Sequence, residues 1–365
     1  MHIPDGYLSP ETCAGFGAVM VPFWAAAARR VRRVVRSRYV PLLALGAAYC
    51  FLVMMFNVPI PDGTTAHAVG AELVAILLGP WAAVVAVSSA LAIQALFFGD
   101  GGVLAYGANC FNMALVMPMV GYATYLVLSR KLTLTAPRRA LAAGAAAYAG
   151  LNAAALCAAV ELGVQPTFFH RADGTPLYAP FHLAQSVPAM ALAHLTVAGG
   201  VELALTAGVI AYLQRANLPL LRINHPNVAE GRAAEAPSTG DAPAAQRRRW
   251  RWTALGLGVM ALLTPLGLLA PGTAFGESAP SRLDLRKYHL DAVPDGLRRY
   301  AGFWHHALFN GYDFAHDRHP AVGYLVSAGV GLIVLAAAGV AVYAASRVIR
   351  RARAARTDGR ETVHA

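Results

Sequence analysis

The chain has 365 residues, 57% of them hydrophobic and only 13% charged, with a formal net charge of +11. Soluble domains carry about a quarter charged residues, and several apolar stretches here are long enough to cross a bilayer core of about 30 Å. The composition therefore excludes an ordinary soluble domain and predicts a polytopic membrane protein. No basic region interleaved with aromatic residues indicates nucleic-acid binding, and the four scattered cysteines indicate neither a disulfide framework nor a thiolate metal site.

The first stretch, from Met1 to Pro10, contains a potential metal chelate. The α-amine, the amide nitrogen of His2 and His2 Nδ1 lie on one short piece of chain and would close a five-membered and a six-membered ring around a metal. Planar nitrogen sites suit Ni²⁺ or Cu²⁺, and Co²⁺ less commonly. Because the His2 side chain is not small, we expect methionine aminopeptidase to leave Met1 in place. A histidine at the second position also arises by accident at exposed termini, so the pattern alone leaves both interpretations open.

The apolar pattern predicts an all-α fold with a seven-helix bundle followed by a two-helix unit. The expected helices span 11–28, 40–57, 66–80, 81–98, 107–128, 140–162, 183–213, 252–270 and 322–346. The helix at 140–162 is dominated by Ala and Gly. Such small residues let membrane helices approach closely, which favours a compact bundle over a wide pore.

Most of the 30 Lys and Arg residues fall on one side of the membrane if these helices alternate in direction. They follow the first, fifth, seventh and ninth helices, and the positive-inside rule makes that side cytoplasmic. We therefore expect the N-terminus outside and the C-terminus inside. Most of the remaining basic residues lie in one long external loop at 271–320, which the rule constrains only weakly.

The second external connection places His67 on the same side as the N-terminus. It follows Val58-Pro59-Ile60-Pro61-Asp62-Gly63-Thr64-Thr65-Ala66, in which two prolines stiffen the approach. We expect a helix to restart here with Thr64 or Thr65 as its N-cap. His67 is then a candidate fourth nitrogen for the chelate, although a single histidine at a helix start also serves as a capping or interface residue.

The third external loop, residues 98–113, combines glycines with two asparagines. Its glycines permit close packing or positive φ. Asn109 and Asn112 share a helical face near the outer membrane boundary, where they are placed either to hydrogen-bond the N-terminal segment or to satisfy a helix terminus. The loop lacks the Gly-Lys-Ser/Thr ending of a nucleotide-binding loop.

These motifs together resemble the CbiM/NikM family. The resemblance covers residues 1–222 and rests on Met1-His2-Ile3-Pro4-Asp5-Gly6, on His67 after Asp62-Gly63-Thr64, and on Gly107-Ala108-Asn109-Cys110-Phe111-Asn112-Met113. The family comprises the substrate-specific membrane components of energy-coupling-factor transporters for cobalt and nickel. It implies a metal held by the Met1 amine, the His2 amide and imidazole, and the His67 imidazole. It further implies a separate transmembrane coupling subunit and separate ATPase subunits.

The C-terminal unit has a resemblance of its own. Pro294-Asp295-Gly296-Leu297, in the external loop at 271–320, resembles the PDGLE domain of small CbiN/NikN-type auxiliary subunits, although Arg298 stands where that motif has Glu. The chain then resembles a fusion of two components. Its expected parts are a metal-binding membrane domain at 1–222, a cytoplasmic linker at 223–250, a PDGLE-like unit at 251–350 and a basic cytoplasmic tail at 351–365.

Several further features remain open at this stage. The histidines of the external loop either capture metal weakly near the entrance or pack as ordinary loop residues: His289, His305, His306, His316 and His319. His194 and Glu202 share a helical face and form a candidate buried polar pair. Ala44 and Ala48 form a small-residue stripe of the kind that related components place against the coupling subunit.

The sequence thus predicts a bacterial inner-membrane, multi-pass component that imports Co²⁺ or Ni²⁺ as its substrate. The preferred interpretation is cobalt uptake for cobalamin biosynthesis, and the alternative is nickel uptake for urease or hydrogenase. We expect no organic cofactor and no enzymatic activity, since ATP hydrolysis belongs to the partner subunits. A membrane metalloenzyme using the external histidines is a further alternative, but it needs an open coordination position and a nearby base, and no residue spacing indicates either.

Overall fold

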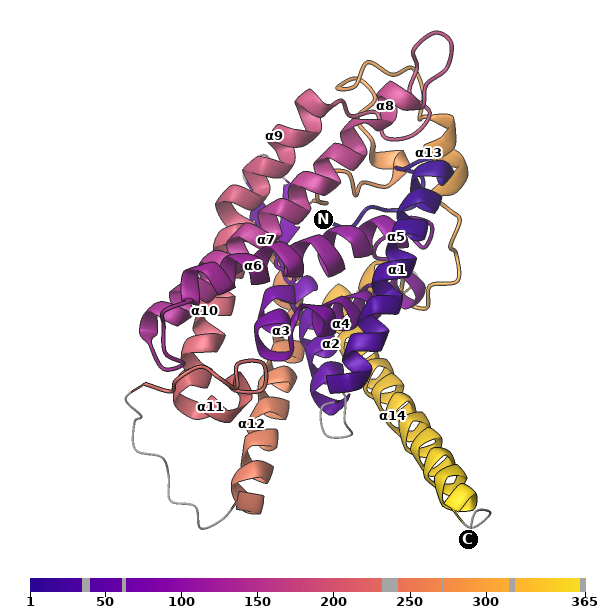
Figure 1. The fold of residues 1–365 in the computed structure, drawn as a ribbon. Helices are drawn as coiled ribbons and strands as arrows, with labels where there is room; N and C mark the ends of the chain where they lie inside the picture. The colour runs from indigo at the N-terminus through magenta and orange to yellow at the C-terminus, as the bar shows by residue number, and fades with distance from the viewer. Residues whose placement is uncertain (35–39, 61–63, 232–241, 271, 315–318, 362–365) are drawn as a thin grey trace.

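The computed structural model describes residues 1–365 except 35–39, 61–63, 232–241, 271, 315–318 and 362–365. It is mostly helical, as expected (Figure 1). Within the described residues, six helical stretches are long and apolar enough to span a membrane: Pro10–Val31, Pro80–Phe98, Tyr106–Ser129, Pro137–Phe168, Leu183–Ala216 and Pro320–Ala345. Two shorter apolar helices lie at Val40–Met54 and Ala254–Leu269. These features agree with a multi-pass membrane protein.

The first third of the chain, up to Ser129, forms helices around the N-terminus. They are α1 (Pro10–Val34), α2 (Val40–Met54), α3 (Ala71–Leu78), α4 (Pro80–Ile93), α5 (Tyr106–Asn109) and α6 (Met117–Ser129). Gly79 separates α3 from α4 with φ +92°, a backbone conformation that favours glycine. The N-terminal residue itself lies inside this group (Figure 1), so the first side chains of the chain belong to the core.

The second half of the bundle is formed by α7 (Pro137–Gly163), α9 (Leu183–Ala193) and α10 (Gly199–Ala216), with short helices α8 (Gln165–Phe168) and α11 (Leu218–Leu221). Alanines and glycines on α7 are buried against its neighbours. At Gly144, for example, an added Cβ would come within 2.8 Å of Leu203 O on α10. The small side chains of α7 therefore set the close helix approach that the sequence predicted.

Three of the apolar stretches contain a π-helical segment. These are η1 (Gln94–Phe98), η2 (Cys110–Val116) and η3 (His194–Ala198). Each contains a buried polar side chain: Gln94, Asn112 and His194 respectively. Such segments add a residue to a helical turn and often occur at functional sites. Here η1 brings Gln94 to the N-terminal segment, as described below.

A two-stranded hairpin replaces the expected start of the third helix. Strand β1 (Asn57–Ile60) pairs antiparallel with β2 (Thr64–His67), with Asn57 opposite His67. The expectation that Thr64 or Thr65 caps a helix was therefore wrong, since α3 begins only at Ala71 after Gly70 with φ +75°. β-branched residues favour extended backbone, and a residue before a proline is driven there as well. Those local preferences keep Thr64–His67 extended, so the third helix begins later than the expected residue 66.

The C-terminal unit consists of α12 (Ala242–Leu263), η5 (Thr264–Leu269), η6 (Pro280–Arg282), α13 (Asp295–Tyr300), η7 (Asn310–Tyr312) and α14 (Pro320–Glu361). Both long helices of this unit contact α2. Gly331 and Gly339 of α14 face Phe51 and Ala44 of α2, which lie within van der Waals range of these glycines. Ala44 and Ala48 were expected to face a coupling subunit. Ala44 instead lies against α14 of the same chain.

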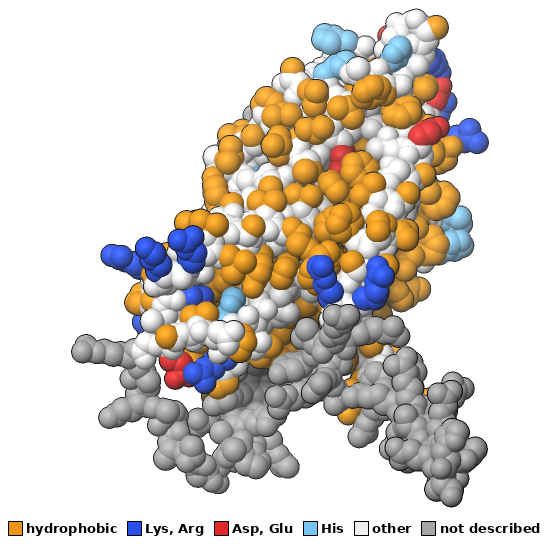
Figure 2. Space-filling model, in the orientation of Figure 1, with side chains coloured by type: hydrophobic (Ala, Val, Ile, Leu, Met, Phe, Trp, Pro, Cys, Tyr) orange, Lys and Arg blue, Asp and Glu red, His pale blue; other side chains and the backbone are white. Residues whose placement is uncertain are grey.

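The surface is divided by residue type. Hydrophobic side chains cover the middle of the face seen in Figure 2, while Lys and Arg side chains gather mainly along its lower edge. Large hydrophobic side chains are well exposed on α6 and α7, including Val127, Leu141 and Leu156. An apolar band of this kind is stable only against lipid or another apolar surface.

Candidate metal centre

The N-terminal segment is fixed inside the bundle. Met1, His2 and Ile3 are only 3%, 3% and 2% exposed. The Ile3 amide donates to Asn109 Oδ1 at 2.8 Å, and Asn109 Nδ2 donates back to the Ile3 carbonyl at 3.0 Å. Gly102 N donates to the same carbonyl at 2.9 Å. Of the two roles left open by the sequence, Asn109 therefore has the first, hydrogen bonding to the N-terminal segment. Asn112 instead donates to Glu161 at 2.9 Å.

A second anchor lies at Asp5. Its carboxylate accepts three backbone hydrogen bonds, from Val103 at 3.0 Å, Leu104 at 2.8 Å and Ala105 at 3.2 Å. Burial raises the pKa of Asp5, and these three donors oppose that rise by stabilising the charged form. An added Cβ at Gly102 would collide with Asp5, so this loop needs glycine to approach the N-terminal segment.

Three nitrogen atoms from the expected ligand residues converge in this buried region. His67 Nε2 lies 3.1 Å from His2 Nδ1 and 3.5 Å from the Met1 amine. The two imidazole ring centroids are 4.8 Å apart, with the planes tilted by 34°. His67 reaches this place from the end of β2, where it is 3% exposed. The hairpin therefore brings His67 to the amine and the imidazole at the N-terminus.

The remaining ring nitrogens have carbonyl acceptors. His2 Nε2 lies 3.2 Å from Gln94 Oε1, and His67 Nδ1 lies 3.0 Å from the Ala68 carbonyl. These oxygens accept only, so they assign the N–H to His2 Nε2 and to His67 Nδ1. The lone pairs then lie on His2 Nδ1 and His67 Nε2, which face each other. Burial, the nearby ammonium and His2 hold the pKa of His67 well below its usual range, which keeps it neutral.

Further polar side chains support this arrangement. Gln94 Nε2 donates to Tyr312 Oη at 2.9 Å, and Tyr312 Oη donates to Asp100 Oδ2 at 2.6 Å. Asp100 Oδ1 lies 3.6 Å from His2 Nδ1. Because Tyr312 belongs to η7, the orientation of His2 depends on a residue from the C-terminal unit. Sequence reasoning did not identify Gln94 or Tyr312, which lie far from His2 in the chain.

The backbone that follows His67 is held by Glu202. Its carboxylate accepts hydrogen bonds from Val69 N at 2.7 Å and from Gly70 N at 3.1 Å. The expected pair of Glu202 with His194 is not formed. His194 Nδ1 instead bonds the Met190 carbonyl at 2.8 Å, and its Nε2 has no hydrogen-bond partner among the described residues. Glu202 therefore supports the turn between β2 and α3.

An unexpected carboxylate completes the group. Glu277, in the loop after η5, accepts a hydrogen bond from the Met1 ammonium at 2.5 Å. Ligand atoms of His2, His67 and Glu277 lie within 4.8 Å of one another. In the described part of the chain, this is the one group of three His, Cys, Asp or Glu side chains arranged to hold a metal ion. A single Glu in a polar loop carries no sequence signal for such a role.

The loop histidines do not join a comparable group within the described residues. His305 and His306 have ring centroids 4.1 Å apart, and His306 packs edge-on against Trp304 at 5.4 Å. His289 occupies the left-handed region with φ 52°. His316 lies outside the described residues. The packing of His306 against Trp304 agrees with the interpretation as ordinary loop residues.

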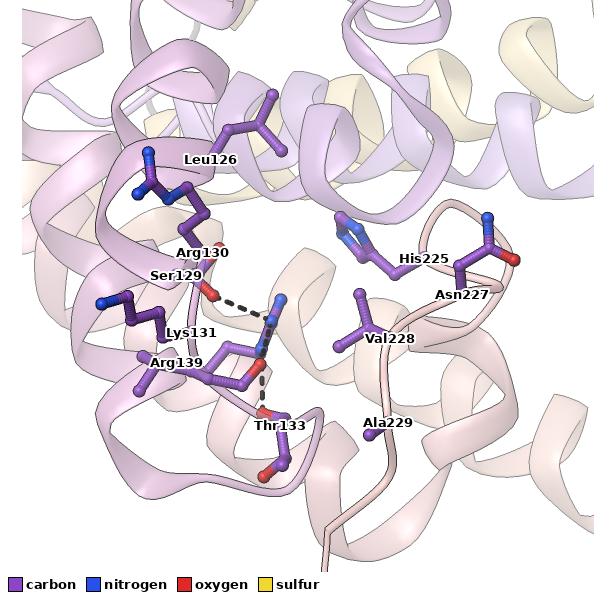
Figure 3. A pocket seen from close by; sticks show the side chains of 11 residues that line it. Leu126, Ser129, Arg130, Lys131, Thr133, Arg139, His225, Asn227, Val228 and Ala229 are labelled. Atoms are coloured by element: carbon purple, nitrogen blue, oxygen red, sulfur yellow. Dashed lines mark hydrogen bonds between the residues drawn. The ribbon is translucent and has the colours of Figure 1, made fainter.

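A separate hollow of about 550 Å³ lies at the turn between α6 and α7 (Figure 3). Its lining includes none of the converging ligand residues: Leu126, Ser129, Arg130, Lys131, Leu132, Thr133, Arg139, His225, Asn227, Val228 and Ala229. Arg139 is buried there and donates to the carbonyls of Thr133 at 3.0 Å and Ser129 at 3.2 Å. Its bonds to backbone oxygens show a structural function, because they order the turn between the two helices.

Comparison with known proteins adds to this geometry. The family described as "Cobalt uptake substrate-specific transmembrane region" matches residues 2–220. The "Fused nickel transport protein NikMN" of Rhodobacter capsulatus is 50% identical over 91% of this chain and 94% of its own length. The "Probable fused nickel transport protein LarMN" of Lactiplantibacillus plantarum is 44% identical over 90% and 93%. A truncated transition metal transporter of known crystal structure is 56% identical, with a TM-score of 0.55 over 58% of this chain and 98% of that one.

Proposed function

Because this chain belongs to the CbiM family of cobalt-uptake membrane components, we propose that it is the substrate-specific membrane component of an importer for Ni²⁺ or Co²⁺. Relatives that align along nearly the whole chain are named fused transport proteins. A role in transport agrees with the expectation that the chain is not itself an enzyme. The membrane metalloenzyme weighed from the sequence has no such support.

The site for the transported ion comprises the Met1 amine, the His2 amide nitrogen, His2 Nδ1 and His67 Nε2. The observation that carries this assignment is the approach of His67 Nε2 to His2 Nδ1 and to the Met1 amine in a buried region. The assigned tautomers point both lone pairs inward, which is the form that ligates a metal. The carbonyl acceptors on the other ring nitrogens fix the ring orientations.

Both candidate ions, Co²⁺ and Ni²⁺, have support from the relatives or from the donor set. The family description names cobalt, in line with the preferred interpretation of the sequence. Nickel is a specific second candidate, because the fused relatives from R. capsulatus and L. plantarum are both named nickel transport proteins. A planar set of four nitrogens also suits Ni²⁺ better than Co²⁺.

Energy for uptake comes from partners in this proposal. A transmembrane coupling subunit and ATPase subunits assemble with this chain in the bacterial inner membrane, with the N-terminus outside and the C-terminus cytoplasmic. The distribution of Lys and Arg along the sequence supports that orientation. Residues 1–222 form the metal-binding domain, and residues 251–350 form the fused auxiliary unit, joined by the linker 223–250. The contact of Glu277 with Met1 suggests why the two units are fused.

Two substitutions test the site. His2→Gln keeps Met1 in place and removes the imidazole, and His67→Ala removes the fourth nitrogen. Each is expected to weaken equilibrium binding of Ni²⁺ and Co²⁺ to the purified full chain by about a hundredfold or more, since even supporting residues cost 10–100-fold. His170→Gln is the control, because His170 is exposed and its ring bonds the Arg171 carbonyl, which is not part of the proposed site. Wild-type affinity in His2→Gln would refute the site.

A further inference from the structure

We propose that Glu277 is the entrance ligand of the site: its carboxylate receives the incoming divalent ion and passes it to the buried nitrogens. The inference rests on the proposed function and extends it to a residue from the C-terminal unit. Its starting observation is the position of Glu277 Oε1, 2.5 Å from the Met1 amine and within ligand range of His2 and His67. An ion bound by Glu277 is therefore already beside the nitrogen donors.

The backbone around Glu277 is attached to the site from two sides. Ala274 forms a parallel bridge with Thr65 of β2, the strand that ends in His67. On the other side, Tyr7 Oη donates to the Ser278 carbonyl at 2.7 Å. Glu277 N closes the turn between these points by donating to the Ala274 carbonyl at 3.0 Å. The carboxylate is thus positioned by the same two segments that carry the nitrogen ligands.

Neighbouring packing fixes the turn further. The Phe275 ring lies 4.6 Å from the Phe181 ring, which in turn stacks on Tyr7 at 5.8 Å. Gly276 has φ +76°, and a Cβ there would approach Leu162 Cδ1 to 2.8 Å. Such a conformation with so little space favours glycine at this position. The turn that presents Glu277 therefore has defined contacts on both of its flanks.

Glu277 is more exposed to solvent than the residues that supply the nitrogen ligands. The Met1 side chain is fully buried, while the Glu277 side chain is 18% exposed. His2 and His67 are buried like Met1. Of the group His2, His67 and Glu277, only the Glu277 side chain is not fully buried. An ion arriving from water meets Glu277 before it meets any of the nitrogens.

The change from an oxygen ligand to nitrogen ligands also favours movement of the ion from Glu277 to the buried site. Carboxylate oxygens suit hard ions such as Mg²⁺ and Mn²⁺, whereas imidazole nitrogens suit Ni²⁺. A nickel or cobalt ion therefore gains affinity at each exchange of oxygen for nitrogen. Asp100 is also partly exposed near His2 Nδ1, but Tyr312 donates to its Oδ2 at 2.6 Å. Glu277 offers the carboxylate beside the amine.

The test compares loading rates with affinity. Stopped-flow mixing of the purified full chain with Ni²⁺ gives the association and dissociation rate constants, and equilibrium dialysis gives the Kd. Glu277→Gln is expected to lower both rate constants about tenfold, because a local anion speeds capture of a cation by that order, and to leave the Kd nearly unchanged. Glu277→Asp keeps the carboxylate and is expected to load faster than Glu277→Gln. Asp291→Asn removes an exposed carboxylate from the same loop and should load like wild type.

Other outcomes separate the two proposals. If His2→Gln loses binding while Glu277→Gln loads at the wild-type rate or faster, the site stands and the entrance role falls, leaving Glu277 as a counter-ion of the amine. A weaker Kd for Glu277→Gln with an unchanged association rate also overturns the entrance role, since it describes a permanent ligand or a support. If the wild-type chain binds neither Ni²⁺ nor Co²⁺, the proposed function itself fails.

Discussion

The orientation of His2 depends on a hydrogen bond to Gln94, a buried side chain 92 positions away in the chain. Gln94 accepts from His2 Nε2 through its Oε1 and donates through its Nε2 to Tyr312. A side-chain amide has one face that accepts and one that donates, so these two bonds also fix which way the amide points. Gln94 is fully buried, which leaves water no access to replace a lost partner.

Gln94→Leu should therefore weaken metal binding although Gln94 is not a ligand. The substitution leaves His2 Nε2–H without an acceptor and lets the ring turn away from the amine, and the expected loss in Ni²⁺ affinity is about 10–100-fold. Gln94→Glu is the matched variant, since it retains an acceptor oxygen at the same place and should lose less. Equilibrium dialysis measures both, and equal affinities for Gln94→Leu and wild type would show that His2 is oriented by other contacts.

Whether a site residue could be predicted from the sequence depended on its separation along the chain from the other site residues. Met1 and His2 are adjacent, so their chelate could be inferred from the covalent structure alone. His67 was assigned through the resemblance to a family, since spacing alone left a capping role open. Glu277 lies 276 positions from Met1 and was not identified. Its role depends on a tertiary contact between two units of the chain, which a local pattern does not encode.

Among the secondary-structure elements, the hairpin and α14 make contacts that join the C-terminal unit to the first unit. The hairpin carries His67 on β2 and pairs through Thr65 with Ala274 of the C-terminal unit. Helix α14 packs lengthwise on α2, the helix that leads into β1. The helical pattern of the long apolar stretches was readable from the sequence. The hairpin was missed because its four-residue strands are too short for a strong alternating signal.

Gly331 of α14 provides a test of that helix contact. An added Cβ would collide with the ring of Phe51 on α2, so Gly331→Leu should push α14 away from the bundle. We expect Ni²⁺ uptake by cells to fall strongly while equilibrium binding by the purified protein changes by less than about tenfold, since the nitrogen ligands lie elsewhere. Gly329→Leu is the matched control, because nothing lies within 4 Å of a Cβ at that glycine. Equal uptake by the two variants would contradict a role for this packing.

For the whole molecule, the apolar band and the fused second unit are the features that matter. The hydrophobic surface in Figure 2 agrees with a multi-pass protein, which composition had already indicated. The C-terminal unit docks through its Pro294-Asp295-Gly296-Leu297 segment, where Gly296 N and Leu297 N both donate to the Leu177 carbonyl, at 2.7 and 3.2 Å. An added Cβ at Gly296 would collide with Tyr178. The glycine of the motif therefore permits the close approach of α13 to the first unit.

A chain truncated near residue 235 separates the functions of the two units. It keeps Met1, His2 and His67 but lacks Glu277 and Tyr312. We therefore expect it still to bind metal, with a Kd about 10–100-fold weaker than that of the full chain, because supporting contacts are lost. It should load slowly, because its entrance carboxylate is gone, and isotope uptake by cells should be lost. Cells expressing full-length His170→Gln serve as the control for assembly with the partner subunits. Uptake by the truncated chain at the full-length rate would show that the C-terminal unit is dispensable, and loss of all binding would show that the ligands of the first unit do not suffice.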